Sequence, residues 1–350
     1  MCRSWLSPRL GGAYESGRAP CVQSVQSGVM DPLQRFEDYA RPFVGAASPW
    51  PELPLPPTER ELWWQNWISQ DSSADLWSAL RRHCPQLLIS PSPDAHLSEP
   101  FRRLVLRGRT PTDEDLQRAP SLFDPQGLRL SIAIQPCGSV PVLDVVNPDD
   151  FVLLLRCLAY RCEPVALPPS VHAQAIDGLI HWGLIRDVNR DTRCQLLILH
   201  QAPYSSLSAS CLPVKMDQQR WLEASRSWRL EHELAHVACQ RLLGEMRINL
   251  YDELIADAVG MLAALDRFDA DLFRQGLGLS TAGQLLPGGR ALTYVGPLHP
   301  DDHERAYQSV LERAQELETL LERGMLPTEP LSLLRCLGRQ RLDQVLRPMM

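Results

Sequence analysis

Helical spacing of hydrophobic positions is followed by short apolar runs along roughly the first hundred residues of the chain. Residues 61–70 (ELWWQNWISQ) and 74–84 (ADLWSALRRHC) have helical spacing and follow a proline-rich linker over residues 45–58. The short apolar runs within residues 86–107 predict strands, or one strand and the end of a helix. The chain therefore begins with a mixture of helices and extended segments.

Three apolar segments predict strands in the middle of the chain. Residues 128–136 alternate and are β-branched, residues 140–148 form a second strand, and Gly138-Ser139 suits the turn between them. Residues 194–200 are apolar throughout and predict a buried strand that enters a serine-rich loop. We expect this strand to lie beside a cleft, where edge pairing would align an extended substrate, with His200 as a candidate to line the cleft.

Helical spacing dominates the rest of the chain. Asp149-Asp150 predict the cap of a helix over residues 151–162, and a proline-bounded turn and another helix follow within residues 163–186. From Trp221 onward the pattern is helical to the end, except in the Gly/Pro segment 274–298. The predicted fold class is α+β, with a small sheet in a mixed N-terminal half and a mainly helical C-terminal half.

Three regions follow from these patterns. Residues 1–29 are rich in Gly, Ser and Arg and predict a disordered tail or an over-extended start, because Met30 is a more natural beginning. Residues 30–215 form the α+β region, and residues 216–350 form the helical region.

Composition narrows the class of protein. The hydrophobic fraction of 44% and charged fraction of 22% are typical of a soluble globular protein. A net charge of -7 argues against nucleic-acid binding, which needs clustered basic residues. No apolar run approaches the ~20 residues of a transmembrane segment, and no export signal is evident. The ten cysteines form no CxxC pair, which is typical of a reducing compartment and predicts a cytoplasmic protein.

The segment 225–262 contains the strongest chemical signal, an HExxH motif. His232 and His236 are four residues apart, so on a helix both imidazoles can bind one metal ion, while Glu233 can address a water molecule on that ion. The surrounding residues 221–243 contain no Pro or Gly, and Gly244 is a typical helix end. The motif therefore lies within a predicted helix.

A second helix predicted from about Asn249 to Phe268 supplies the carboxylates that a two-histidine site needs. Glu253 and Asp257 are four residues apart and share a face. One carboxylate can complete a three-ligand zinc site, and the other can fix the tautomer of a ligating histidine. The alternative is a coincidental pair of buried histidines.

The strings HELAH and DELIADAVG resemble the two zinc helices of thermolysin-like gluzincins. The resemblance implies that His232, His236 and Glu253 bind Zn²⁺, that Glu233 is the general base, and that Asp257 orients His232. It also implies that the two regions of the chain form together one zincin-like catalytic unit.

Three departures from that family limit the resemblance. The gap between His236 and Glu253 is shorter than in thermolysin, which implies a tighter connection, and Asp252 stands where the family has Asn. The edge-strand motif that binds substrate in the family is missing, so its substrate preference does not transfer.

A weaker resemblance lies in residues 298–305 (LHPDDHER), which open a predicted helix over residues 303–324. The segment is similar to the His-Pro…Arg element that follows the zinc helices in some intracellular and membrane gluzincins. A donor opposite the general base would stabilise an oxyanion, and the candidates are His299, His303, Tyr294 and Tyr251. The alternative is that the two histidines cap the start of the helix.

The whole stretch from Trp228 to Gly260 is also similar to an uncharacterised family of cyanobacterial proteins of unknown function. The expected function is that of a zinc metallopeptidase acting on a peptide or protein substrate. The alternative is a non-catalytic zinc-binding protein with a regulatory or interaction role. A di-iron carboxylate site would need a second ExxH motif, and the sequence has none.

Overall fold

A four-stranded mixed sheet lies in the first half of the protein, whose computed structural model describes residues 35–70, 75–189, 194–212 and 215–348. The spatial order is β1-β2-β4-β3, with β4 antiparallel to β3, parallel to β2, and β1 antiparallel to β2. The prediction that residues 194–200 pair with a substrate at a sheet edge is wrong, because β4 is an inner strand. The strands are β1 (Arg129–Gln135), β2 (Gly138–Val145), β3 (Ala173–Leu179) and β4 (Cys194–His200).

The hairpin between β1 and β2 turns two residues earlier than the sequence predicts. Gln135 pairs with Gly138, so the turn consists of Pro136 and Cys137, and Gly138 belongs to β2. Pro136 cannot donate to the ladder, which favours a turn at this point. Gly138 has φ +136°, and a Cβ there would meet the Oε1 atom of Glu61 at 2.6 Å. The glycine is therefore needed for its backbone conformation and for close packing.

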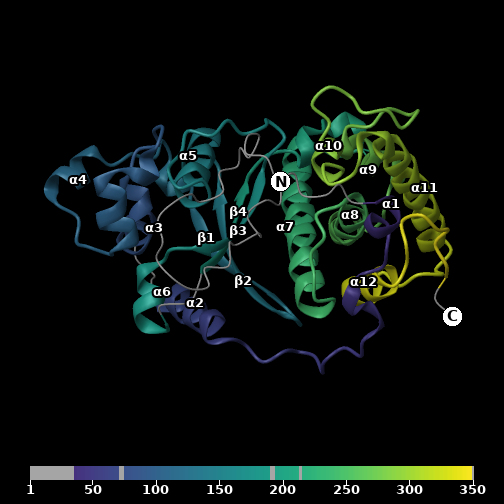
Figure 1. Cartoon of the computed structure of the whole chain (residues 1–350), viewed down its shortest axis with the longest axis horizontal. Coiled ribbons are helices and arrows are strands. Elements are labelled where there is room, and N and C mark those ends of the chain that lie inside the picture. The colour runs from purple at the N-terminus through teal and green to yellow at the C-terminus, as the bar shows by residue number, and fades with distance from the viewer. Residues whose placement is uncertain (1–34, 71–74, 190–193, 213–214, 349–350) are drawn as a thin grey trace.

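Short helices surround the sheet on the side away from the C-terminal half (Figure 1). The predicted helices over residues 61–70 and 74–84 are confirmed as α2 and α3. The segment 86–107 forms 3-10 turns and one π-helical turn, Phe101–Leu106, where strands were expected. The helices of this half are α2 (Glu59–Gln70), α3 (Leu76–His83), α4 (Asp113–Arg118), α5 (Pro148–Leu158) and α6 (Trp182–Asp187).

Two local predictions in this half are wrong. Within residues 163–186 the expected helix is mostly the strand β3, since Ala173 pairs with Leu199 of β4 and tertiary pairing outweighs an ambiguous local pattern. The helix α5 is capped by Asn147, whose side chain accepts the backbone N–H groups of Asp149 and Asp150. A cap must precede the helix, and these two aspartates already lie in its first turn.

The long helix α7 (Gln218–Leu242) stands between the sheet and the remaining helices (Figure 1). Leu234 and Val237 form one buried cluster with Val142 of β2 and Leu197 of β4, and Leu230 packs against it. Because these residues recur every three or four positions, one face of α7 covers the sheet. The opposite face is left for the C-terminal helices.

The helical half is completed by the first described segment of the chain. The Tyr39 hydroxyl on α1 (Phe36–Tyr39) donates to the carbonyl of Tyr294 and accepts the N–H of Leu250. Residues near position 40 therefore pack with the helical region, although the sequence assigned residues 30–215 to the α+β region. The remaining helices are α8 (Leu250–Leu265), α9 (Ala270–Leu277), α10 (Ala291–Tyr294), α11 (His303–Glu322) and α12 (Pro330–Gly338).

The predicted α+β class is confirmed, with the small sheet in the N-terminal half and helices in the C-terminal half. The Gly/Pro segment 274–298 still holds the end of α9 and the short α10. Residues 1–29, predicted as a tail or an over-extended start, lie outside the described residues.

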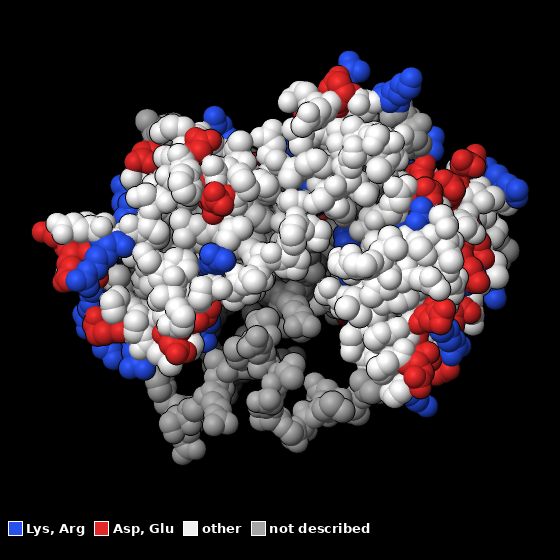
Figure 2. Space-filling model, turned by 90° about the horizontal axis from the view of Figure 1, so that it is seen from above, with Lys and Arg blue, Asp and Glu red and all other residues white. Residues whose placement is uncertain are grey.

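The surface carries both signs of charge. In Figure 2 acidic and basic side chains gather on the outer flanks, while the surface between the two halves is mostly uncharged. None of the helices that the structure describes is long and apolar enough to cross a membrane.

Candidate metal centre

The two predicted motif helices form an antiparallel pair, and local sequence signals fix their ends. Asp217 caps α7 by accepting the N–H of Arg220 at 2.9 Å, and Gly244 follows its end with φ +76°. Asn249 caps α8 by accepting the N–H of Asp252 at 2.9 Å. The predicted boundaries of both helices are confirmed to within a few residues.

The register of this pair is set by residues spaced one turn apart on each helix. Along α7, Trp228, His232 and His236 point toward α8. Trp228 meets Gly260, where a Cβ would lie 2.6 Å from the Trp228 carbonyl oxygen. His232 then meets Asp257, and His236 meets Glu253. The small glycine thus allows the approach that brings the polar groups together.

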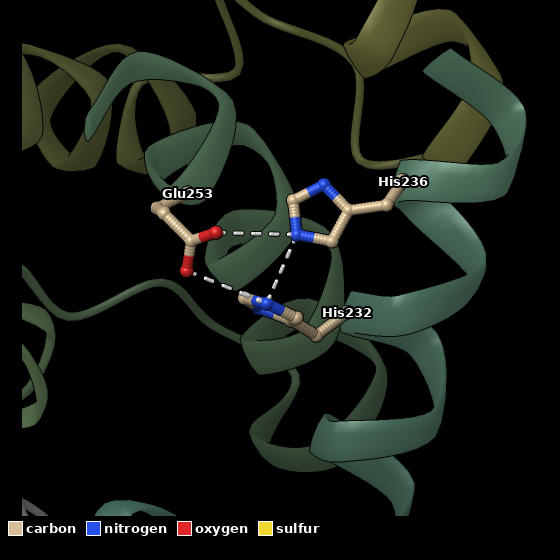
Figure 3. A group of neighbouring side chains, drawn as sticks. All are labelled: His232, His236 and Glu253. Atoms are coloured by element: carbon tan, nitrogen blue, oxygen red, sulfur yellow. Dashed lines mark hydrogen bonds and ion pairs between the residues drawn. The ribbon is translucent and has the colours of Figure 1, made fainter. Parts of the chain in front are cut away.

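His232, His236 and Glu253 converge as the sequence predicted, with one ligand atom from each within 4.8 Å of the others (Figure 3). The two Nε2 atoms lie 3.2 Å apart. The Glu253 carboxylate lies 3.4 Å from Nε2 of His236 and 3.6 Å from Nε2 of His232. Tetrahedral zinc with bonds of about 2.0–2.2 Å would separate its ligand atoms by roughly 3.3–3.5 Å. The group therefore has the spacing of a zinc site.

A carboxylate lies behind each of the two imidazoles. Nδ1 of His232 lies 2.9 Å from Asp257, and Nδ1 of His236 lies 3.4 Å from Asp252. A carboxylate accepts only, so the neutral His232 ring carries its hydrogen on Nδ1 and presents a lone pair at Nε2. With the same tautomer on His236, two lone pairs would face each other at 3.2 Å and repel unless a cation lay between them. The sequence predicted this role for Asp257 but not for Asp252.

The Glu253 carboxylate also fits a metal ligand. Its side chain is fully buried, and among the residues that the structure describes neither of its oxygens has a hydrogen-bond partner. Burial acts to raise the pKa of Glu253, but the contact with His236, the His232 ring and the Arg290 guanidinium together hold it well below its ordinary value. A charged, buried carboxylate without hydrogen bonds is unfavourable unless it binds a cation.

Asp257 is held by more partners than sequence reasoning indicated. Its Oδ1 accepts the Trp228 indole N–H at 3.0 Å and the Tyr204 hydroxyl, and its Oδ2 accepts Arg290 at 2.5 Å. Burial acts to raise the pKa of Asp257, and the charge of Arg290 with the contact to His232 lowers it below its ordinary value. Asp257 therefore stays ionised and can orient His232.

Tyr204 and Arg290 are two further residues near the site that sequence reasoning missed. Tyr204 lies in the loop after β4, with its hydroxyl 3.2 Å from Nδ1 of His232. Burial and the adjacent Asp257 raise its pKa well above the ordinary value, so the phenol keeps its proton and donates it. Arg290 lies 5.5 Å over the Tyr204 ring and 3.9 Å from Glu253. No spacing to the motif signals either residue, because each comes from a different part of the chain.

Glu233 lies on α7 next to His232 and is 5% exposed. Within the described part of the chain its Oε2 atom is buried and has no hydrogen-bond partner. Glu233 is adjacent in sequence to His232, and an unpaired carboxylate oxygen can accept a proton. The role of Glu233 as a general base stays a prediction.

The other predicted catalytic residues lie at the start of α11. Nδ1 of His299 accepts the N–H of Asp301, and its side chain is 55% exposed. His303 places Nε2 3.3 Å from the Leu298 carbonyl. These contacts are those of a helix start, and the oxyanion role of His299 and His303 stays a prediction. The Tyr251 hydroxyl donates to the carbonyl of Leu337 in the core.

Similarity to a known protein family extends over both halves of the molecule. No curated protein and no solved structure matches the chain. One family model matches residues 39–195 and 191–325, which include the sheet and both helices of the His–His–Glu group. Because these segments cover most of the 350 residues, the chain belongs to the family described as Family of unknown function (DUF7005).

Proposed function

We propose that this protein is a zinc-dependent hydrolase of the gluzincin type that cleaves a peptide or other amide bond. The observation that carries the proposal is the buried, unpaired carboxylate oxygen of Glu233, adjacent in sequence to a ligand of the His–His–Glu group. A structural zinc site has four protein ligands, whereas this group offers three and leaves a position for water. The resemblance to thermolysin-like gluzincins supports the same residue roles.

In this proposal each residue has one chemical task. His232, His236 and Glu253 hold the zinc ion, which when bound polarises a water molecule and the substrate carbonyl. Glu233 takes a proton from the attacking water and delivers it to the leaving amine. Asp257 and Asp252 keep the two imidazoles in the tautomers that bind metal.

The sheet supports a peptide as the substrate. β1 is an edge strand of the described sheet. Its last residue, Gln135, donates from its side chain to the carbonyl of Leu234, one position beyond Glu233. An extended peptide that pairs with β1 would therefore pass close to the helix of the general base. The uncharged surface between the halves in Figure 2 suits an uncharged main chain.

We also infer that the protein acts in the cytoplasm, because the cysteines whose side chains the structure describes are all free. Fractionation of cells that express the full chain tests this location. Recovery outside the cytoplasmic fraction would contradict it.

Zinc analysis of the purified protein and cleavage of a peptide library test the proposed activity. We expect about one zinc per chain, as three protein ligands and a water imply. Glu233→Gln should retain the zinc and lose hydrolysis, because an amide cannot take the proton. Glu231→Gln, two residues away and half-buried, is the matched control and should remain active. Loss of zinc in Glu233→Gln, or hydrolysis undiminished by it, would contradict the assigned role.

A second candidate is a non-catalytic zinc-binding protein, and the burial of the centre favours it. The side chains of His236 and Glu253 are fully buried and that of His232 is 6% exposed, so a substrate has little direct access. This candidate predicts one zinc per chain, no cleavage of any library peptide, and no effect of Glu233→Gln beyond stability.

A further inference from the structure

A second group of reactive side chains lies where the loop that carries Tyr204 meets the ends of β3 and β4, outside the His–His–Glu group. His172 precedes β3, His200 ends β4, and Ser206 follows in the loop. The two histidines are neighbours because the N–H of His200 donates to the carbonyl of His172 at 2.8 Å and so prolongs the ladder between β3 and β4. Ser206 is exposed, so small molecules can reach it.

The three side chains form a continuous chain of polar contacts. Oγ of Ser206 lies 3.0 Å from Nε2 of His172, and Nδ1 of His172 lies 3.1 Å from Nδ1 of His200. His200 is 9% exposed, stacks on the Phe151 ring with centroids 5.2 Å apart, and hydrogen-bonds the backbone of Val146. Strand pairing and ring stacking therefore hold both imidazoles in place.

The hydrogen-bond partners determine which ring nitrogens of His200 and His172 carry a hydrogen. Nδ1 of His200 faces His172, which leaves the other ring nitrogen, with its hydrogen, for Val146. Nδ1 of His200 is then an acceptor, so Nδ1 of His172 carries a hydrogen and Nε2 of His172 has a lone pair. That lone pair accepts the hydroxyl proton of Ser206. The opposite arrangement would set two lone pairs against each other at 3.1 Å.

The serine oxygen has a second neighbour, the carbonyl of Pro169 at 3.4 Å. This contact is longer than the 3.0 Å to His172, and it would require the unfavourable tautomer. Ser205 and Ser206 also have φ of +47° and +60°, a region that residues other than glycine rarely adopt. Backbone strain of this kind is often found where a reactive side chain must be presented.

We propose that Ser206, His172 and His200 form a second reactive site, in which Ser206 is a nucleophile toward esters with good leaving groups. A nucleophile in contact with a base, and a base oriented by a third group, are the general requirements for covalent catalysis. Here the third group is a neutral imidazole in place of a carboxylate.

The reaction would proceed in two balanced steps. Oγ of Ser206 attacks the carbonyl carbon, its proton passes to Nε2 of His172, and the bond to the leaving alcohol breaks as that alcohol takes the proton from His172. Water then attacks the acyl-serine, gives its proton to His172, and releases the acid as Oγ recovers that proton.

The environment of His172 limits the substrate class. Burial, with the nearby charge of Arg229, lowers the pKa of His172 to about 3. The ring is therefore neutral at pH 7 and able to accept a proton, but it is a weak base. Aryl esters and fluorophosphonates, whose leaving groups need little help, fit such a site, and amides do not.

Labelling of the full chain with a fluorophosphonate, followed by mass spectrometry of the peptides, tests the site. In that reaction Ser206 displaces fluoride and forms a stable adduct. We expect Ser206 to react at least ~100-fold faster than exposed Ser210 on the same loop, the lower range of a general-base contribution. Ser210 is an internal control that needs no variant, and the reagent reports on serine independently of zinc.

Two alanine variants test whether Ser206 is the serine that reacts. Ser206→Ala should abolish the adduct and the release of p-nitrophenol from p-nitrophenyl acetate that accompanies acylation, while Ser205→Ala should keep both. Absence of an adduct on Ser206 in the wild-type protein, or a rate on Ser206 equal to that on Ser210, would overturn the proposal. The wild-type measurement decides even where a variant fails to fold.

Discussion

The substitution Gly260→Ala tests how closely α7 and α8 pack. Gly260 lies on the face of α8 that carries Glu253 and Asp257, and it touches Trp228 of α7. In an isolated helix, Gly→Ala stabilises by about 1 kcal/mol because alanine has the higher helix propensity. In this protein a Cβ at position 260 would lie 2.6 Å from the Trp228 carbonyl oxygen. Helix propensity therefore predicts that Gly260→Ala stabilises the protein, whereas the close contact with Trp228 predicts that it destabilises the protein.

The expected destabilisation follows from the distance between the new Cβ and the Trp228 carbonyl oxygen. Ordinary contacts of a Cβ begin at 3.4 Å, so α8 would have to move about 0.8 Å from α7. The obstacles are Cδ1 of Trp228, which would lie nearer still, and the Trp228 carbonyl oxygen. The indole is buried and hydrogen-bonded to Asp257, and the oxygen belongs to the backbone of a long helix, so neither can turn aside as an exposed side chain would. Overpacking of this kind costs about 1–3 kcal/mol, which exceeds the propensity gain, so we expect a net destabilisation of about 1–2 kcal/mol. Ligand distances in a metal site tolerate only about 0.2 Å, so zinc affinity should fall at least ~10-fold.

Urea unfolding and competition for zinc against a chelator of known affinity measure both effects. Gly276→Ala is the matched control, because Gly276 lies in α9 and a Cβ there would have its nearest neighbours at 3.8 and 3.9 Å. This control should be neutral or stabilised by up to about 1 kcal/mol and should bind zinc normally. If Gly260→Ala were as stable as Gly276→Ala and bound zinc as tightly as the wild type, the packing argument would be refuted.

Three further predictions concern buried polar groups. Asp257→Asn should lower zinc affinity about 10–100-fold, measured by competition with a chelator. It should also destabilise the fold by about 3 kcal/mol in urea unfolding, because it leaves the Arg290 charge without its carboxylate. Asp252→Asn should weaken zinc binding about 10-fold in the same competition. The free energy of unfolding should change little, because the amide oxygen of the asparagine can still accept the Arg247 N–H. Unchanged zinc affinity would show that Asp252 does not belong to the site. Burial lowers the pKa of His181 to about 3 from its ordinary 6.5, so below pH 6.5 the unfolded chain takes up a proton that the folded protein does not. Stability should fall by up to about 1.4 kcal/mol per pH unit between pH 6.5 and 3 from this group, and unfolding of His181→Asn at pH 7 and pH 5 should show a smaller loss than the wild type.

The residues of the metal centre could be predicted because their geometry is local. His232 and His236 share a face at a spacing of four, as do Glu253 and Asp257, and each pair lies within one helix. Asn249 and Gly244 fix the ends of these helices through contacts within a few residues. Nothing from the rest of the chain is needed to place these side chains on the faces that meet.

Features that depend on distant parts of the chain could not be predicted in this way. The sequence predicts a helix where β3 forms, because this short apolar run becomes a strand only by pairing with β4. Arg290 reaches Asp257 across 33 residues, and Tyr204 reaches it across 53. His172 and His200 are brought together by the same strand pairing.

The antiparallel register of α7 and α8 links three properties that could otherwise vary separately. Successive turns pair Trp228 with Gly260, His232 with Asp257, and His236 with Glu253. The first pair sets the distance between the helices, the second sets the tautomer of a ligand, and the third closes the His–His–Glu group. Because both helices repeat every 3.6 residues, a shift of one turn would break all three pairs together. In the proposed zinc protein, stability and zinc affinity should therefore change together along this face and independently elsewhere.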